Sequence, residues 1–189
     1  MNRIVRTIAT SSLLATALVL AGCATPANQQ AMTVGKPVAV KNQHPFTVSV
    51  ATSGGATTGS GESSNISNDD LKTAIETSIK QSNLFKEVVA GTAGQYHLNV
   101  AVTQLDKPMF GASFTVTLET AWTLVRASDK AVVWRKAIKG AHTATMSDAF
   151  VGVTRLRLAL EGAARANIEQ GIAGVSDVTM DGARQAAIR

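Results

Sequence analysis

The spacing of apolar positions changes along the chain from a helical period to a strand period. Between Leu71 and Ile79, apolar residues recur three and four positions apart, which predicts an amphipathic helix over residues 68–82. Ser67 precedes this run and Asp70 follows three residues later, a pattern close to a capping box. We therefore expect the helix to begin at Ser67.

The rest of the central chain is predicted to be extended. Apolar residues alternate with polar ones after residue 95, which is typical of strands that are buried on one face. Between the first strands and the helix, the Gly, Ser and Thr tract at 52–65 lacks any apolar period and is expected to form a loop. The extended segments are predicted at residues 34–40, 46–50, 84–89, 96–102, 114–124 and 131–143.

The last two of these segments form a predicted hairpin. Their even-numbered apolar residues can share one sheet face if an odd number of residues forms the loop, and the loop 128–130 has three. Leu124 would then face Trp134, with Trp122 as a diagonal neighbour. We expect both tryptophans to pack in the core beneath a helix; the alternative is an exposed pair that contacts lipid or glycan.

A second amphipathic helix is predicted over residues 147–170, with Ser147 as its N-cap. Arg157, Glu161, Arg165 and Glu169 follow one another at four-residue spacing along its flank. Such a ladder is usually a solvated stripe, and its alternative role is partner contact through Arg157, Glu161 and Arg165. The apolar face predicted to pack on the sheet comprises Val153, Leu156, Leu160, Ala163, Ala164 and Ile168, with Phe150 at its margin.

This order of elements predicts an α+β fold. We expect a two-layer sandwich, with a mainly antiparallel sheet and the two helices packed on one of its faces.

The N-terminus has the pattern of an export signal. Arg3 and Arg6 precede an apolar run over residues 7–20, which is shorter than the ~20 residues that a membrane span needs. Leu20-Ala21-Gly22-Cys23 follows and resembles a bacterial lipobox, which predicts cleavage between Gly22 and Cys23 and lipidation of the Cys23 thiol. The alternatives are an ordinary cleaved signal with a chance cysteine, or a cytosolic protein with an apolar N-terminal helix.

Lipidation would anchor the protein to a membrane, because two or three acyl chains hold a protein stably where one does not. The resemblance to lipoproteins also implies a location: Ala24 follows the cysteine where an Asp would signal retention in the inner membrane, so we expect the periplasmic face of the outer membrane. The predicted divisions are a signal peptide at 1–22, a lipidated and flexible tether at 23–33, one periplasmic domain at 34–172 and a poorly ordered tail at 173–189.

Composition changes this picture little. The chain carries 18 Lys and Arg against 13 Asp and Glu, a net charge of +5, but the basic residues are dispersed. One cluster, Arg135, Lys136 and Lys139, lacks the interleaved aromatic residues of a nucleic-acid surface, so we expect no nucleic-acid partner.

Residues suited to catalysis do not form a recognisable motif. His44, His97 and His142 are far apart and lack zinc-site spacing, and the single cysteine is assigned to the lipid. Glu161 lies among arginines, which should keep its pKa low and unsuited to general acid catalysis. We therefore expect no metal, no cofactor and no enzymatic activity, although a site dispersed in sequence could still assemble in the fold.

A family resemblance follows from the order of motifs. The lipobox, "SNLFKEV", "YHLNVAV", the hairpin "FTVTLETAWTLVRASDKAVVWRKAI" and "TRLRLALEGAARANI" together resemble the YajG-like and auxiliary-type lipoproteins of the Gram-negative outer membrane. The resemblance implies a non-catalytic accessory module for envelope assembly or transport, with an envelope protein or lipid as partner. The alternative function is a periplasmic enzyme or cell-wall-binding protein with a dispersed site.

Overall fold

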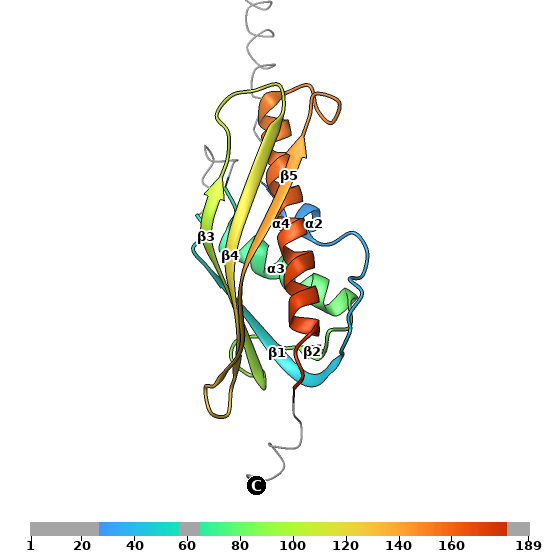
Figure 1. Ribbon diagram of the computed structural model, residues 1–189, viewed down its shortest axis with the longest axis vertical. Helices are drawn as coiled ribbons and strands as arrows, with labels where there is room; N and C mark the ends of the chain where they lie inside the picture. The colour runs from blue at the N-terminus through green and yellow to red at the C-terminus, as the bar shows by residue number, and fades with distance from the viewer. Residues whose placement is uncertain (1–26, 57–64, 181–189) are drawn as a thin grey trace, which may run out of the picture.

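The structure is a computed structural model that describes residues 27–56 and 65–180 of the 189-residue chain (Figure 1). A five-stranded sheet and three helices make up this part. The strands are β1 (His44–Ser53), β2 (Phe85–Val88), β3 (Tyr96–Asp106), β4 (Phe114–Arg126) and β5 (Val132–Ala144); the helices are α2 (Gln29–Met32), α3 (Asn68–Gln81) and α4 (Gly152–Ser176).

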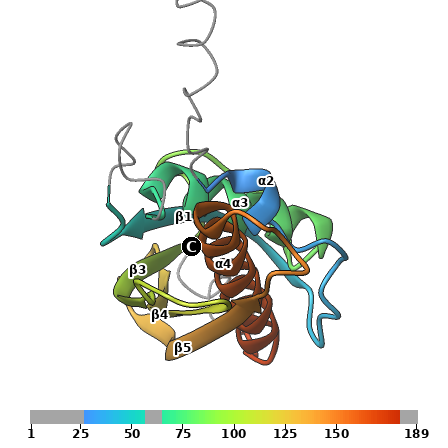
Figure 2. The same ribbon diagram turned by 90° about the horizontal axis from the view of Figure 1, so that it is seen from above.

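The sheet has the strand order β2-β1-β3-β4-β5. The long strands β3, β4 and β5 pair antiparallel, whereas β1 is parallel to both of its neighbours. Parallel neighbours need a crossover, and α3 supplies it between β1 and β2. α3 and α4 pack against the sheet and α2 packs on both of them (Figure 2). The predicted α+β two-layer sandwich is therefore confirmed.

The predicted hairpin register is also confirmed. Leu124 lies opposite Trp134 across β4 and β5, and Trp122 lies opposite Lys136. Trp122 is fully buried, while Trp134 is half-buried near the end of the sheet. Trp122 therefore has the predicted core position, and Trp134 lies at the margin of that core.

Helix α3 begins and ends close to its predicted limits. The Ser67 hydroxyl accepts a hydrogen bond from the Asp70 amide at 3.0 Å and donates to the Asp70 carboxylate at 2.6 Å. The helix ends at Gln81, and Asn83 then adopts a positive φ of 49°, which turns the chain into β2. The local capping pattern was sufficient to place this element.

The strand predicted at 34–40 is wrong. Val34 donates its amide to Ser78 Oγ at 3.2 Å, and Val38 donates to Ser82 Oγ at 2.9 Å. These two serines belong to α3 and its C-cap. The segment therefore runs along α3 without pairing with the sheet, because hydroxyls of the helix bind its amides in place of a strand.

The predicted start and end of the last helix are also corrected. Ser147 is not its cap: the Asp148 carboxylate accepts from the Thr145 amide at 2.7 Å and closes a separate turn before α4 begins at Gly152. At its other end α4 continues to Ser176, which is buried. Residues 173–176 thus belong to the domain, and the tail predicted at 173–189 was placed too early.

The buried face of α4 matches the predicted one at Leu160, Ala163, Ala164 and Ile168 and differs at the start of the helix. Val153 is 44% exposed and Phe150 83% exposed, although both were placed on or near the apolar face. Small residues form much of the true contact face, including Ala159, Ala163 and Gly171, which are fully or almost fully buried. These small residues share the contact with bulky ones such as Leu160 and Ile168, and they let the helix lie close to the sheet.

Two glycines permit this close approach. A Cβ added at Gly140 of β5 would overlap the Ala163 carbonyl oxygen, and one added at Gly171 of α4 would overlap the Trp122 ring. Within the contact, Asn167 Oδ1 accepts hydrogen bonds from the Thr120 hydroxyl at 2.8 Å and from Trp122 Nε1 at 3.2 Å. The polar tip of a buried tryptophan is thus satisfied from the helix.

The amide group of Asn167 binds the sheet as well. Its Nδ2 donates to the carbonyl oxygen of Ile138 at 2.9 Å and to that of Leu118 at 3.2 Å. One side chain of α4 therefore bonds to both β4 and β5. Because all of these atoms are buried, each bond lost would leave a polar group unpaired in the core.

We expect Trp122→Ala to destabilise the domain by about 3–5 kcal/mol, since it creates a large cavity and removes the bonds of the indole N–H. Thr123→Ala, on the opposite face of the same strand, should change the free energy of unfolding by no more than about 0.5 kcal/mol. Urea unfolding followed by circular dichroism measures both values. Equal losses in the two variants would show that the two faces of β4 are wrongly assigned.

Candidate functional site

The first described residues are packed on the domain. Ala27 and Met32 are both buried, and Asn28 caps the short helix α2 by accepting the Ala31 amide at 3.0 Å. α2 contacts α3 and α4. The tether predicted at 23–33 is therefore shorter than expected, because its second half belongs to the folded domain.

Two charged side chains of α4 hold this segment. The Glu161 carboxylate accepts hydrogen bonds from the Asn28 amide at 3.3 Å and from Asn28 Nδ2 at 3.5 Å. One turn further along the helix, Arg165 Nε donates to the Ala31 carbonyl oxygen at 3.2 Å. The flank predicted as a solvated stripe is thus covered in part by the N-terminal segment of the same chain.

The three predicted contact residues therefore differ in their surroundings. Glu161 is 3% exposed and is unavailable to an outside partner, so that part of the prediction is wrong. Arg157 is half-buried, and Arg165 is exposed although it bonds to Ala31. The physical reason is that α2 lies over the middle of the ladder.

Burial raises the pKa of Glu161, although the Asn28 hydrogen bond and the charges of Arg157 and Arg165 act in the opposite direction. The prediction of a low pKa is corrected on this point. The arginines were expected to dominate, but the packing of α2 removes water from the carboxylate, and that cost is larger.

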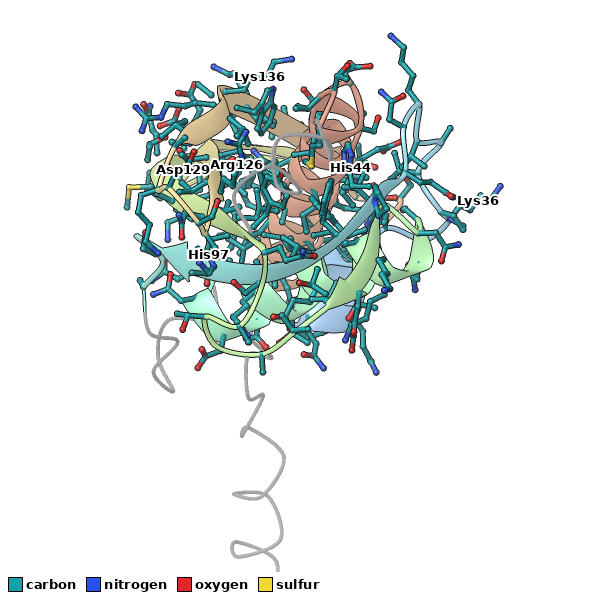
Figure 3. All side chains as sticks on the ribbon, turned by 90° about the horizontal axis from the view of Figure 1, so that it is seen from below. Lys36, His44, His97, Arg126, Asp129 and Lys136 are labelled. Carbon is teal, nitrogen blue, oxygen red and sulfur yellow. The ribbon has the colours of Figure 1, made fainter. Side chains whose placement is uncertain are left out.

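The three histidines lie in separate parts of the fold. His44 Nε2 lies 3.1 Å from the Val175 carbonyl oxygen, and burial lowers the pKa of this ring. His97 Nδ1 forms a 2.6 Å hydrogen bond with Ser49 Oγ across β1 and β3. His142 is exposed on β5. Figure 3 shows His44 and His97 well apart, each with different neighbours.

The pair Ser49 and His97 is the arrangement closest to a nucleophile and base. Ser49 is only 3% exposed, and among the described residues no carboxylate is hydrogen-bonded to His97 to orient its ring. Over the same residues, no group of three His, Cys, Asp or Glu side chains is placed to hold a metal ion. These side chains have the geometry of structural contacts.

Surface hollows offer little more. The largest described hollow, of about 600 Å³, is an open depression at the start of β1 and β2 that His44, Pro45, Asn83 and Phe85 help to line. A smaller hollow, of about 300 Å³, lies at the surface between α2 and α3, beside Gln30 and Thr77. Neither collects several titratable groups around one point.

Comparisons with known proteins give a fold and no family. No protein-family model matches the sequence, and no curated protein matches it significantly. The crystal structure of XCC0632 from Xanthomonas campestris, a DUF330 protein, superposes with a TM-score of 0.59 at 16% identity, over 83% of this chain and 97% of that one. This likeness shows a shared fold.

Two further crystal structures are similar at lower scores. A protein of Caulobacter crescentus designated a lipoprotein has a TM-score of 0.47 and 13% identity, over 75% of this chain and 92% of its own. A minor lipoprotein of Acinetobacter baumannii has a TM-score of 0.39 and 12% identity, over 67% and 90%. Membership of the YajG-like lipoproteins stays a prediction.

The predicted lipidation site, Gly22 and Cys23, lies outside the described residues. Asn28 and Arg155 were not predicted from the sequence, although Asn28 carries a signal: an asparagine just before helix-forming residues is a favoured N-cap. Arg155 gave no such signal, since its partners are backbone carbonyls, of Ala149 and Phe150 in the preceding loop and of Gly111 in a loop distant in sequence. Within the described residues, none of the helices has the length and apolar character needed to cross a membrane.

The Glu161→Gln variant should gain stability relative to the natural protein as pH rises from 4 to 7. A carboxyl whose pKa is raised by folding adds most stability below its unfolded pKa, and that contribution is lost as pH rises through the folded pKa. Glutamine does not titrate and can still accept from Asn28. Urea unfolding of both proteins across this pH range measures the difference, with Glu169→Gln as the exposed control; a difference that is flat with pH would contradict the role of burial.

Proposed function

We propose that this protein is an envelope lipoprotein, anchored through acyl chains on Cys23, whose domain serves as a non-catalytic interaction module at the periplasmic face of the outer membrane. The observation that carries this proposal is the position of Ala27, four residues after Cys23, in the buried core of the domain. A lipobox so close to the folded domain makes the lipid and the domain a single unit.

The hydrogen bonds of Asn28 and Ala31 to α4 support this arrangement. A flexible tether of 11 residues, as predicted at 23–33, would leave the domain free to move through a large volume. With α2 docked, only four residues connect Cys23 to Asn28. The domain would therefore stay at the membrane surface, where its effective concentration for membrane-bound partners is high.

The assignment to the outer membrane rests on Ala24, the residue after the lipidated cysteine. The non-catalytic role rests on the hydrogen bonds of the side chains that could act in catalysis. Glu161 binds the N-terminal segment, His44 binds the end of α4, and His97 binds a buried serine. The side chains that we considered for catalysis thus form hydrogen bonds that hold the fold together. Accessory modules of this kind act by binding, which needs surfaces and no reactive centre.

Cys23→Ala should block lipid transfer and leave a full-length precursor. The thiol is the group that receives the lipid, so its loss removes the modification and the cleavage that depends on it. Labelling with radioactive palmitate, together with mass spectrometry of the N-terminus, checks both. The mature natural protein should also take up no maleimide after denaturation, since its one thiol is blocked. Normal cleavage and normal membrane fractionation of the variant would overturn the proposal.

Ser49 should not react with a fluorophosphonate probe. A serine that is 3% exposed and bonded to a histidine without an orienting acid lacks both access and activation. Gel fluorescence after incubation with the probe measures labelling, and Ser49→Ala is the matched control. Labelling of the natural protein that disappears in this variant would favour the alternative of a periplasmic enzyme.

A further inference from the structure

Large exposed apolar side chains gather at one end of the domain. Seven are found in the described residues, and six of them belong to two loops and the first turn of α4. The seventh, Val132, lies at the opposite end, beside the β4–β5 hairpin. The six, which we term the apolar tip, are Met109, Phe110, Met146, Phe150, Val151 and Val153.

The two loops lie side by side at the upper end of Figure 1, where β3 leads into β4 and β5 leads into α4. Phe114, which begins β4, pairs with Ala144, which ends β5. The buried side chain of Arg155 joins the loops: its Nη1 donates to the carbonyl oxygens of Ala149 and Phe150 at 2.9 and 2.6 Å. Its Nη2 reaches Gly111 in the other loop at 3.5 Å.

Arg155 also lies over the ring of Phe114, 5.4 Å from its centroid. A buried guanidinium with bonds to both loops fixes their backbones relative to the sheet. The exposure of the apolar tip is therefore a property of an organised structure. Phe110 is 85% and Phe150 83% exposed, whereas the other three phenylalanines of the chain, Phe46, Phe85 and Phe114, are buried. Exposed apolar groups in one place mark an interaction surface.

The chain length before Asn28 decides which end of the domain lies near Cys23. Four residues lie between Cys23 and Asn28, and the five steps of chain that join them can span at most about 17 Å. Asn28 is held at Glu161, which is nine residues, or about 14 Å of helix, from Gly152 at the tip end of α4. Ser176 is fifteen residues, or about 22 Å, away in the other direction. Cys23 can therefore reach the tip end and cannot reach the opposite end.

The direction in which residues 28–31 run along α4 agrees with this estimate of how far Cys23 can lie from Asn28. Ala31 bonds to Arg165 and Asn28 to Glu161, so the chain approaches the tip end of α4 as residue numbers fall toward Cys23. A chain that continues in this direction from Ala27 would bring the Cys23 lipid to the side of the domain that carries the apolar tip. Phenyl rings and methionine side chains are suited to the boundary between lipid headgroups and acyl chains.

We propose that the apolar tip inserts into the interfacial region of the bilayer that holds the Cys23 lipid, with Phe110 and Phe150 as its anchors. The inference rests on the proposed lipid anchor. Apolar side chains of an interfacial element typically enter about 5–10 Å into the headgroup and acyl boundary. The domain then stands on the membrane with the tip down, and the hairpin end with Val132 points away from the bilayer.

A depth measurement tests this orientation in the full-length lipidated protein. The variants Phe110→Cys, Phe150→Cys and Val132→Cys each add one reactive thiol, since Cys23 is blocked by lipid, and each is labelled with an environment-sensitive nitrobenzoxadiazole dye. The proteins are placed in vesicles of phosphatidylethanolamine and phosphatidylglycerol that contain nitroxide lipids. We expect dye quenching several-fold stronger at positions 110 and 150 than at 132. All three sites are exposed, so unfolding midpoints should match the natural protein.

The remaining outcomes separate this inference from the proposed function. If the proteins float with the vesicles but all three dyes are quenched equally, the tip does not insert, although the anchor stands. If Phe110→Cys instead forms efficient cross-links between copies and escapes the nitroxide, the tip is a subunit interface and the inference is overturned. If the proteins do not float and the natural protein takes up dye at Cys23, the anchor is absent and both proposals fail.

Discussion

The close contact between α4 and the sheet is the constraint on which the other features depend. Gly140 and Gly171 remove the side chains that would separate helix and strands, and Asn167 then bonds to β4, to β5 and to the Trp122 indole. A polar side chain in a core is costly unless its bonding capacity is filled, and here four bonds fill it. The position of α4 along the sheet is therefore specified by hydrogen bonds as well as by packing.

A helix fixed in this way provides a frame for the N-terminal segment. The flank of α4 that carries Glu161 and Arg165 contacts α2, and both side chains bond to it or to its N-cap. The buried Glu161 carboxylate is a destabilising element at neutral pH, since folding raises its pKa. The same carboxylate accepts the hydrogen bonds that hold Asn28. The N-terminal segment is thus part of the fold, although it appears in the sequence as a polar spacer.

The sequence predicted the structure correctly where neighbouring residues decide it, as in a helix cap or in a hairpin loop with an odd number of residues. The Ser67 cap and the helical period placed α3, and an odd loop length placed Leu124 opposite Trp134. Both results follow from residues close to one another in the chain. The fold class followed from the order of such elements.

Where residues distant in sequence decide the structure, the pattern of apolar and polar positions was insufficient to predict it. The predicted strand at 34–40 binds the hydroxyls of Ser78 and Ser82, which no local period reveals. The predicted contact face of α4 included Val153, which is exposed, and missed Gly171, which packs against Trp122, a residue distant in sequence. Glu161 resembled every other member of a charged ladder until the fold placed α2 over it.

Helix α4 also explains how two loops and an N-terminal segment can share an orientation. Arg155 holds the loops of the apolar tip, and Glu161, six residues or about 9 Å further along the same helix, holds Asn28. Because a helix of this length bonded to a sheet is rigid, the distance between these two attachments is fixed.

A lipid attached at Cys23 and side chains displayed at Phe110 and Phe150 would then reach one plane without any adjustment of the domain. An orientation set by two attachments resists tilting, whereas a single flexible tether would allow every orientation. The face of the sheet and the hairpin end would accordingly be presented to the periplasm in a defined direction, which is what a module that acts by binding requires.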